Sequence, residues 1–370
     1  MRGRLRFEVR SENARNACAT VEERRFSAAQ GEQKNKGVLT PEGCTFREED
    51  NAMIYSVRHT TTFRYEPAVR ESLMEVRLQP RSDGDQRCLS FTLNVDPAAN
   101  IMQYRDFMGN TVHHFDIAGR HSMVKVTAQS AVEVLTVPAP PSSGSGDWAD
   151  LDAMVAASDH WEMLLPSRFA HSSAPVEQLA KELGCERRGT PLHLLTELNE
   201  GIYKLFAYVP NSTKVDSPIE EALQTHQGVC QDFAHIMITL VRGLKIPCRY
   251  VSGYMFHRDK DEHDRSMEGA SHAWIEALVP NFGWMAFDPT NNLVGGDRHI
   301  RVAIGRDYAD VPPTRGVYKG EAQSELSVAV TVSPADSIVP EPITPSFVVR
   351  SRPVLVRAAA RSEQEQQQQQ

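Results

Sequence analysis

Long apolar runs are missing from this sequence of 370 residues. No stretch of 18 consecutive apolar residues occurs, so the sequence predicts no membrane-spanning helix. The first seven residues, Met-Arg-Gly-Arg-Leu-Arg-Phe, lead into no apolar segment of the kind a secretory signal needs. Acidic residues in the next positions also disfavour a transit peptide: Glu8, Glu12, Glu22 and Glu23. We therefore expect a cytoplasmic protein that does not bind a membrane.

Cysteine is also scarce, with six residues at irregular spacing and no CxxC pair. This number is too small for a disulfide scaffold and favours reduced thiols in the cytosol. The sequence also lacks the motifs of two other classes of protein. There is no GxSxG, which argues against a serine hydrolase, and no GxxxxGK[ST] or GxGxxG, so nucleotide binding has no support.

Charge and composition exclude little more. The chain has 40 basic and 48 acidic residues, a net charge of −8, and no long basic run, which argues against nucleic acid as its main partner. Hydrophobic residues make up 41% and charged residues 24%, as in ordinary globular proteins. The length suffices for two modest domains.

Changes of pattern divide the chain. Residues 1–52 lack any period and are predicted to be a disordered extension, and Met53 is a candidate start of the native chain. Residues 53–136 form an N-terminal antiparallel β domain, and the Pro/Ser/Gly-rich residues 137–150 form a linker. Residues 151–334 form a catalytic core with helical periods. The Gln-rich residues 335–370 are predicted to be a disordered tail.

The N-terminal domain shows the period of two that is typical of half-buried strands. Apolar and polar residues alternate from Cys88 to Val95, and every second residue from Tyr55 to Tyr65 lies on one face of a strand. Further strands are expected at 73–78, 111–117, 123–127 and 131–135, separated by turn signals such as Gly119-Arg120. This pattern predicts an antiparallel, sandwich-like arrangement.

The segment from Gln227 onward carries the chemistry. After Cys230, apolar residues recur at helical spacing, at Phe233, Ile236, Met237, Leu240, Val241 and Leu244. Gly228 permits a tight turn into this helix, so Cys230 is predicted to lie at its N-terminus. Unpaired amides and the helix dipole there favour a thiolate and could stabilise an oxyanion.

A predicted hairpin supplies the partners of this thiol. His272 begins a strand whose other face is apolar (Ala273, Ile275, Ala277 and Val279), and a short turn leads to the strand Trp284–Asp288. Antiparallel pairing can bring Asp288 beside His272, where a carboxylate fixes the tautomer of the imidazole and stabilises its charged form. The three residues therefore fit a nucleophile, its base and the group that orients the base.

The motifs GVCQDFAH, IPCRYVSGY, SHAWIE and GWMAFDPTNN resemble the core of the bacterial transglutaminase-like superfamily. The resemblance covers roughly residues 191–300, and the strand-rich residues 53–135 are similar to the domain that often precedes this core in bacteria. It implies an α+β fold with a papain-like core, in which a helix bearing the Cys packs on an antiparallel sheet bearing His and Asp. It also implies the triad Cys230, His272 and Asp288.

Other residues of the segment have simpler interpretations. Cys248 lies in an apolar strand and is expected in the core. Asp232 and His235 follow Cys230 closely, and we expect surface or supporting roles for them. The run His257–His263 is rich in potential ligands but lacks zinc-like spacing, so a solvated loop is expected.

The expected chemistry is acyl transfer through a Cys230 thioester, on a peptide or a glutamine carboxamide. Hydrolysis is the favoured outcome, as the resemblance implies. Protein cross-linking and a non-catalytic binding module that keeps the fold stay open as alternatives. We expect a peptide or protein substrate, no cofactor and no metal, and the sequence does not indicate an oligomeric state.

Overall fold

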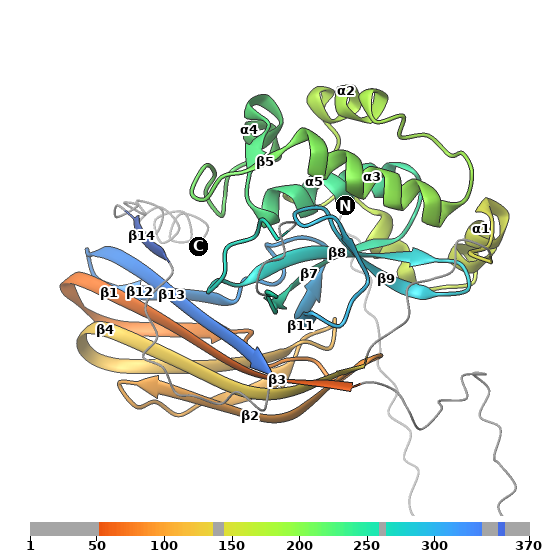
Figure 1. Cartoon of the computed structure of the whole chain (residues 1–370). Coiled ribbons are helices and arrows are strands. Elements are labelled where there is room, and N and C mark those ends of the chain that lie inside the picture. Colours follow the sequence, from red (N-terminus) through yellow and green to blue (C-terminus); the bar gives the residue numbers. More distant parts are fainter. Residues whose placement is uncertain (1–51, 136–143, 259–263, 335–346, 352–370) are drawn as a thin grey trace, which may run out of the picture. The chain divides into compact units, whose positions relative to one another are not determined.

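The computed structural model describes residues 52–135, 144–258, 264–334 and 347–351. The predicted extension lies almost wholly outside these residues, as do much of the predicted linker and most of the tail. From residue 48 onward the described elements form three layers: helices, a five-stranded core sheet, and a seven-stranded N-terminal sheet (Figure 1). Within the described residues, no helix is long and apolar enough to cross a membrane.

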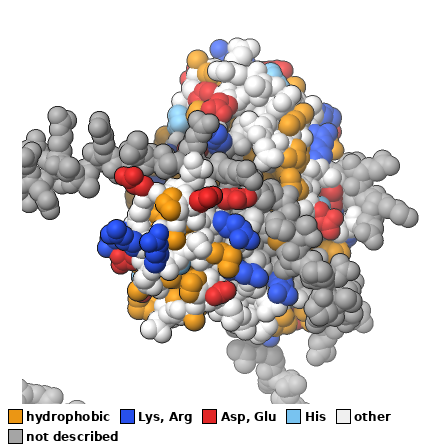
Figure 2. All heavy atoms as spheres, turned by 90° about the vertical axis from the view of Figure 1, so that its left-hand side faces the viewer, with side chains coloured by type: hydrophobic (Ala, Val, Ile, Leu, Met, Phe, Trp, Pro, Cys, Tyr) orange, Lys and Arg blue, Asp and Glu red, His pale blue; other side chains and the backbone are white. Residues whose placement is uncertain are grey.

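The N-terminal sheet is antiparallel and has the order β14-β13-β1-β4-β2, with β12 on β1 and β3 on β4. Its strands are β1 (Ala52–Val76), β2 (Gln86–Asp96), β3 (Met102–Arg105), β4 (Thr111–Leu135), β12 (Thr314–Lys319), β13 (Gln323–Pro334) and β14 (Phe347–Ser351). On the face of the molecule that Figure 2 shows, basic, acidic and apolar side chains are interspersed, and side chains of one charge do not cover it.

Several strands that the sequence predicts separately are continuous. The expected strand that ends at Tyr65 and most of the expected strand 73–78 are parts of β1, which ends at Val76, and the three strands expected between 111 and 135 are all β4. The register between β1 and β4 shifts on both sides of Val69, and Gly119 on β4 has φ +86°. The predicted turn at Gly119 is therefore a bulge, which changes the register without ending the strand.

The C-terminal strands belong to this sheet as well. β13 pairs with β1 from Tyr55 to Glu66, and β12 pairs with β1 from Glu71 to Val76. Residues 314–334, which the sequence places in the catalytic core, therefore hydrogen-bond to the N-terminal domain. The pairing of β12 and β13 with β1 cannot be seen in the local sequence pattern, because the fold determines which strands are neighbours.

The core sheet has the order β10-β9-β8-β7-β11, and every adjacent pair is antiparallel. Its strands are β7 (Cys248–Met255), β8 (His272–Val279), β9 (Gly283–Asp288), β10 (Leu293–Val294) and β11 (His299–Gly305). The helices are α1 (Trp148–Ala156), the 3-10 helix η1 (His160–Leu164), α2 (Ala174–Glu182), α3 (Pro191–Leu205), α4 (Ile219–Thr225) and α5 (Cys230–Gly243). A short parallel pair joins β5 (Ala207–Tyr208) to β6 (Gln227–Gly228).

The helix α5 is the centre of the helical layer. Every residue from Gln231 to Arg242 is buried. Its apolar side chains share a core with the β8 face that the sequence predicts to be apolar: Ala273, Ile275, Ala277 and Val279. The opposite face of β8 is buried too, including Trp274 and Glu276, because the N-terminal sheet packs against that side of the core sheet.

Two amide side chains close the outer edge of the core sheet. Gln86 accepts a hydrogen bond from the Arg301 amide (2.7 Å) and donates one to its carbonyl (2.9 Å). Asn110 does the same with Ile304, at 2.8 Å for both bonds. These amides imitate a neighbouring strand along β11, so the edge of the core sheet is satisfied by the N-terminal domain.

Candidate active site

The Cys230 thiol lies where the sequence predicts it, at the first residue of α5. It is half-buried. The N-terminus of α5 is held by Asp232, whose carboxylate accepts hydrogen bonds from the Val229 amide (2.8 Å) and the Thr213 hydroxyl (2.5 Å). The amides of Asp232 and Phe233 donate to the Val229 carbonyl (3.0 and 3.2 Å), so the amides at the very start of α5 are the ones available to a negative charge that forms on the acyl group.

Gly228 has a different role from the predicted one. Its backbone belongs to β6, and the left-handed conformation is found two residues earlier, at His226 (φ 53°). A Cβ on Gly228 would approach the Asp232 side chain to 3.0 Å and the Phe233 ring to 3.1 Å. The glycine therefore permits the close packing of this strand on the first turn of α5, and His226 supplies the turn.

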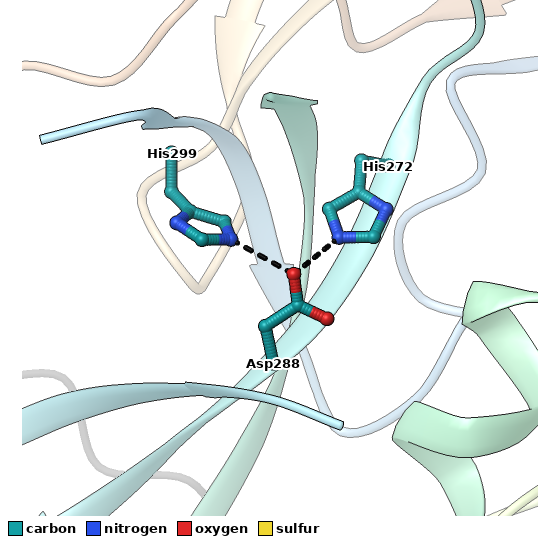
Figure 3. A group of neighbouring side chains, drawn as sticks. All are labelled: His272, Asp288 and His299. Atoms are coloured by element: carbon teal, nitrogen blue, oxygen red, sulfur yellow. Dashed lines mark hydrogen bonds and ion pairs between the residues drawn. The ribbon is translucent and has the colours of Figure 1, made fainter. Parts of the chain in front are cut away.

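The hairpin of β8 and β9 brings His272 and Asp288 together. Ile275 pairs with Phe287, so Asp288 lies opposite Trp274 and diagonal to His272. His272 Nε2 donates to Asp288 Oδ2 at 2.8 Å (Figure 3). Both side chains are almost fully buried, at 3% and 2% exposure. The predicted contact between base and orienting carboxylate is present in the structure.

The other ring nitrogen of His272 is left for the thiol. Nδ1 is buried and has no hydrogen-bond partner among the described residues. Burial alone would lower the pKa of His272, but the Asp288 carboxylate and the nearby Cys230 side chain outweigh it and raise the pKa from 6.5 to about 10. An imidazole with this pKa carries a proton at neutral pH, which suits a thiolate–imidazolium pair.

Asp288 is held by more donors than the sequence suggests. Its Oδ2 also accepts from His299 Nε2 (3.1 Å) and Asn291 Nδ2 (2.8 Å), and its Oδ1 accepts from the amides of Thr290 (2.9 Å) and Asn291 (3.2 Å). Burial would raise the pKa of Asp288, but the two histidines hold it well below its usual value. The carboxylate is therefore fixed in position and in its charged form.

His299 and Asn291 are the site residues that sequence reasoning missed. Asn291 belongs to the GWMAFDPTNN motif, so its place next to Asp288 was a usable signal. His299 comes from β11, where it pairs with Met255 of β7. Both imidazoles point at the same carboxylate oxygen (Figure 3). Nothing in the local pattern of residues 299–305 indicates that this strand reaches the site.

These three side chains also have the atoms that a metal would need. Nε2 of His272, Nε2 of His299 and a carboxylate oxygen of Asp288 all lie within 4.8 Å of one another. Their separations of 2.8 and 3.1 Å are those of N–H···O hydrogen bonds, and Asn291 donates a third bond to the same oxygen. Hydrogen bonds thus account for this cluster, and their effect is to hold the Asp288 carboxylate beside His272.

The remaining candidates have supporting roles. His235 is buried, accepts a hydrogen bond from the Tyr308 amide (3.2 Å) and stacks on Phe169, and burial lowers its pKa to about 3. Cys248 is fully buried as expected, and burial raises its pKa to about 12. His257 hydrogen-bonds Ser266 (3.0 Å), whereas residues 259–263 of the expected loop lie outside the described residues.

Comparison with known proteins identifies the family. Residues 55–133 match the bacterial transglutaminase-like N-terminal region, and residues 178–289 match the transglutaminase-like superfamily. An uncharacterized protein of Mycobacterium leprae is 33% identical over 277 residues, which cover 75% of this chain and 97% of that protein. This chain belongs to the transglutaminase-like superfamily. Cys230, His272 and Asp288 all lie within the residues that match the superfamily, 178–289.

Two further relatives have described activities. A protein-glutamine gamma-glutamyltransferase of Pseudomonas aeruginosa is 29% identical over 160 residues, 40% of this chain and 24% of that protein. A crystal structure from Cytophaga hutchinsonii, described as a putative cysteine protease, has a TM-score of 0.61 and 22% identity and covers 81% of this chain and 98% of that one. The second likeness confirms the transglutaminase-like fold with its N-terminal strand-rich region.

Proposed function

We propose that the protein is a thiol acyltransferase that acts on a peptide or glutamine carboxamide, with water as its acceptor. The observation that carries the proposal is the buried His272–Asp288 pair, which leaves the second ring nitrogen of His272 to Cys230. A nucleophile, a base and a group that orients the base are the parts that covalent acyl transfer requires. The proposed partner is a peptide or protein substrate.

The steps follow from these positions. The Cys230 thiolate attacks the carbonyl carbon, and amides of the first turn of α5 stabilise the oxyanion. The His272 imidazolium gives its proton to the departing nitrogen, so ammonia or an amine leaves and a thioester remains. Neutral His272 then takes a proton from water, whose oxygen attacks the thioester and releases the acid and the thiolate. Asp288 keeps the ring oriented through both steps.

Cross-linking is the second candidate, because the Pseudomonas relative is described as a protein-glutamine gamma-glutamyltransferase. In that case a lysine amine replaces water in the second step. Hydrolysis is preferred because water needs no binding site of its own, whereas an amine must be positioned and protected from competition by water.

Mass spectrometry of peptide substrates, with and without a primary amine, tests the proposal. We expect a mass increase of about 1 Da on glutamine, or cleavage, and no amine adduct. Cys230→Ala should abolish both the product and labelling by iodoacetamide at neutral pH. Cys185→Ala is the matched control, because Cys185 is half-buried like Cys230 but burial raises its pKa to about 11. Activity that survives Cys230→Ala would contradict the mechanism, and an unreactive Cys230 would favour a binding module.

A further inference from the structure

A cavity of about 660 Å³ lies at the C-terminal end of α3. Its apolar part is formed by Leu205, Phe206 and Tyr208, and His226, which directly follows α4, lies against Phe206 with ring centroids 5.4 Å apart. None of these residues belongs to the triad. The volume is that of a site for one or two amino-acid side chains of a bound peptide.

Among the residues that the structure describes, the charged side chains that line this cavity are both basic, Lys204 and Arg265, and no carboxylate lines it. Arg265 donates from Nη1 to the carbonyls of Tyr203 (2.7 Å) and Phe206 (3.3 Å). Its Nε and Nη2 make no hydrogen bond to the residues that the structure describes. Lys204 forms an ion pair with the exposed Glu200 (2.6 Å), a type of contact that contributes little and breaks easily. Lys204 can therefore turn to a bound anion, whereas the Arg265 guanidinium is held over the Tyr203 ring, 3.5 Å from the ring centroid, and offers Nε and Nη2 from a fixed position.

One residue that lines the cavity, Gln227, is three residues before Cys230 in the chain. The parallel pair of β5 and β6 carries the chain directly from Gln227 to Cys230. Three extended residues span roughly 10 Å. Tyr208 lines the cavity too, and the proximity of Cys230 is one cause, after burial, of the raised pKa of this tyrosine. When a peptide is joined to Cys230 as a thioester, a peptide residue two or three positions from the attacked residue can therefore reach the cavity.

A second connection joins the cavity to the carboxylate of the triad. The Arg265 amide donates to Asn291 Oδ1 at 2.7 Å, and Asn291 Nδ2 donates to Asp288 Oδ2 at 2.8 Å. The cavity is thus flanked on one side by a neighbour of Cys230 and on the other by the residue that holds Asp288. This position is that of a substrate subsite.

We propose that this cavity binds an acidic residue of the peptide substrate, two or three positions from the residue that Cys230 attacks. The carboxylate lies between Lys204 and Arg265, and its aliphatic stem lies on Leu205 and Phe206. This inference rests on the proposed action on peptides, and it adds the class of sequence that the enzyme selects.

The test measures peptide binding to the full chain with Cys230→Ala, so that no chemistry occurs. Fluorescein-labelled peptides carry one glutamine and, two or three positions away on either side, Glu or Gln. We expect at least one Glu peptide to bind about five-fold more tightly than its Gln analogue, the effect of one partly exposed ion pair. The ratio should fall as salt is raised from 50 to 300 mM.

Adding Lys204→Glu should bring the ratio to one or below, and Lys204→Gln should give an intermediate value. Lys181→Glu makes the same charge change on the exposed surface of α2 and should leave the ratio unchanged. Equal affinities, no binding of any peptide, or a ratio that Lys204→Glu leaves intact would overturn the inference. If the binding preference holds but the wild-type chain processes no peptide, the proposed function fails and the subsite stands.

Discussion

The two sheets of this protein bury their strands in different ways. Along much of β1, buried residues alternate with more exposed ones, whereas all eight residues of β8 are buried. The N-terminal sheet packs one face on the core sheet, but the core sheet lies between that sheet and α5. His272 and Asp288 therefore lie in the layer from which water is excluded on both sides.

The same contrast holds for ion pairs. On the N-terminal sheet, Lys319 and Glu71 form a pair with side chains 75% and 48% exposed, whereas His272 and Asp288 are 3% and 2% exposed. Water and salt screen the first pair, and little screens the second. Two ion pairs with similarly short distances should therefore contribute unequally to stability and activity. Substitutions in the two sheets can measure this difference.

The largest effect is expected from Asp288→Asn. The amide cannot hold a charged imidazole, so we expect kcat to fall by about 10³-fold or more. The pKa of His272 should fall from about 10 toward 6.5, because Asp288 is the main cause that raises it. The alkaline limb of the residual activity should therefore move to lower pH. A pH–rate profile checks both effects, and an unchanged limb would show that Asp288 does not control His272.

The same substitution should change the pH dependence of stability. A histidine whose pKa is raised on folding contributes its full stabilisation below pH 6.5 and loses it as the pH rises toward about 10. Between these values the wild-type free energy of unfolding should decline through this residue, and in Asp288→Asn the decline should be much smaller. Urea unfolding at pH 6 and pH 9.5 measures the difference.

The next effect concerns a buried structural pair in the core sheet. Arg249 donates to Glu276 at 2.7 Å and lies over the Trp284 ring, whereas Arg301 approaches Glu276 only to 3.5 Å. Arg249→Met leaves a 2% exposed carboxylate with this single weaker partner. We expect a loss of about 3 kcal/mol of unfolding free energy, measured by urea denaturation. A loss below 1 kcal/mol would show that Arg301 can replace Arg249.

The sequence predicts most of what this site needs and little of what surrounds it. The helix of Cys230 and the hairpin of His272 and Asp288 are local, so spacing and turn residues suffice to predict them. His299 cannot be predicted in this way, because only the order of strands brings β11 to Asp288. For the same reason the burial of Trp274 and the pairing of β13 with β1 leave no periodic signal.

A smaller effect is expected from His299→Phe. Phenylalanine keeps the contact with Trp274, whose ring centroid is 4.9 Å from that of His299, but it removes one donor to Asp288. A hydrogen bond to a charged group contributes about 1.5–3 kcal/mol, so kcat should fall by about 10- to 100-fold. His299 also lowers the pKa of Asp288, so activity should be lost at a higher pH on the acidic side than in the wild type. His299→Gln, which retains a donor, should recover part of the rate.

The smallest effect is expected on the N-terminal sheet. Lys319 and Glu71 are directly opposite each other on β12 and β1, with a short separation of 2.5 Å between Nζ and Oε2. Distance alone would rank this pair above His272–Asp288. Exposure reverses the ranking, because solvent screens the attraction and both chains lose side-chain entropy in making it. Lys319→Met should therefore change the unfolding free energy by less than about 1 kcal/mol, and 0.5 M salt should remove most of that change. A loss of unfolding free energy as large as that of Arg249→Met would mean that burial does not determine how much an ion pair contributes in the two sheets.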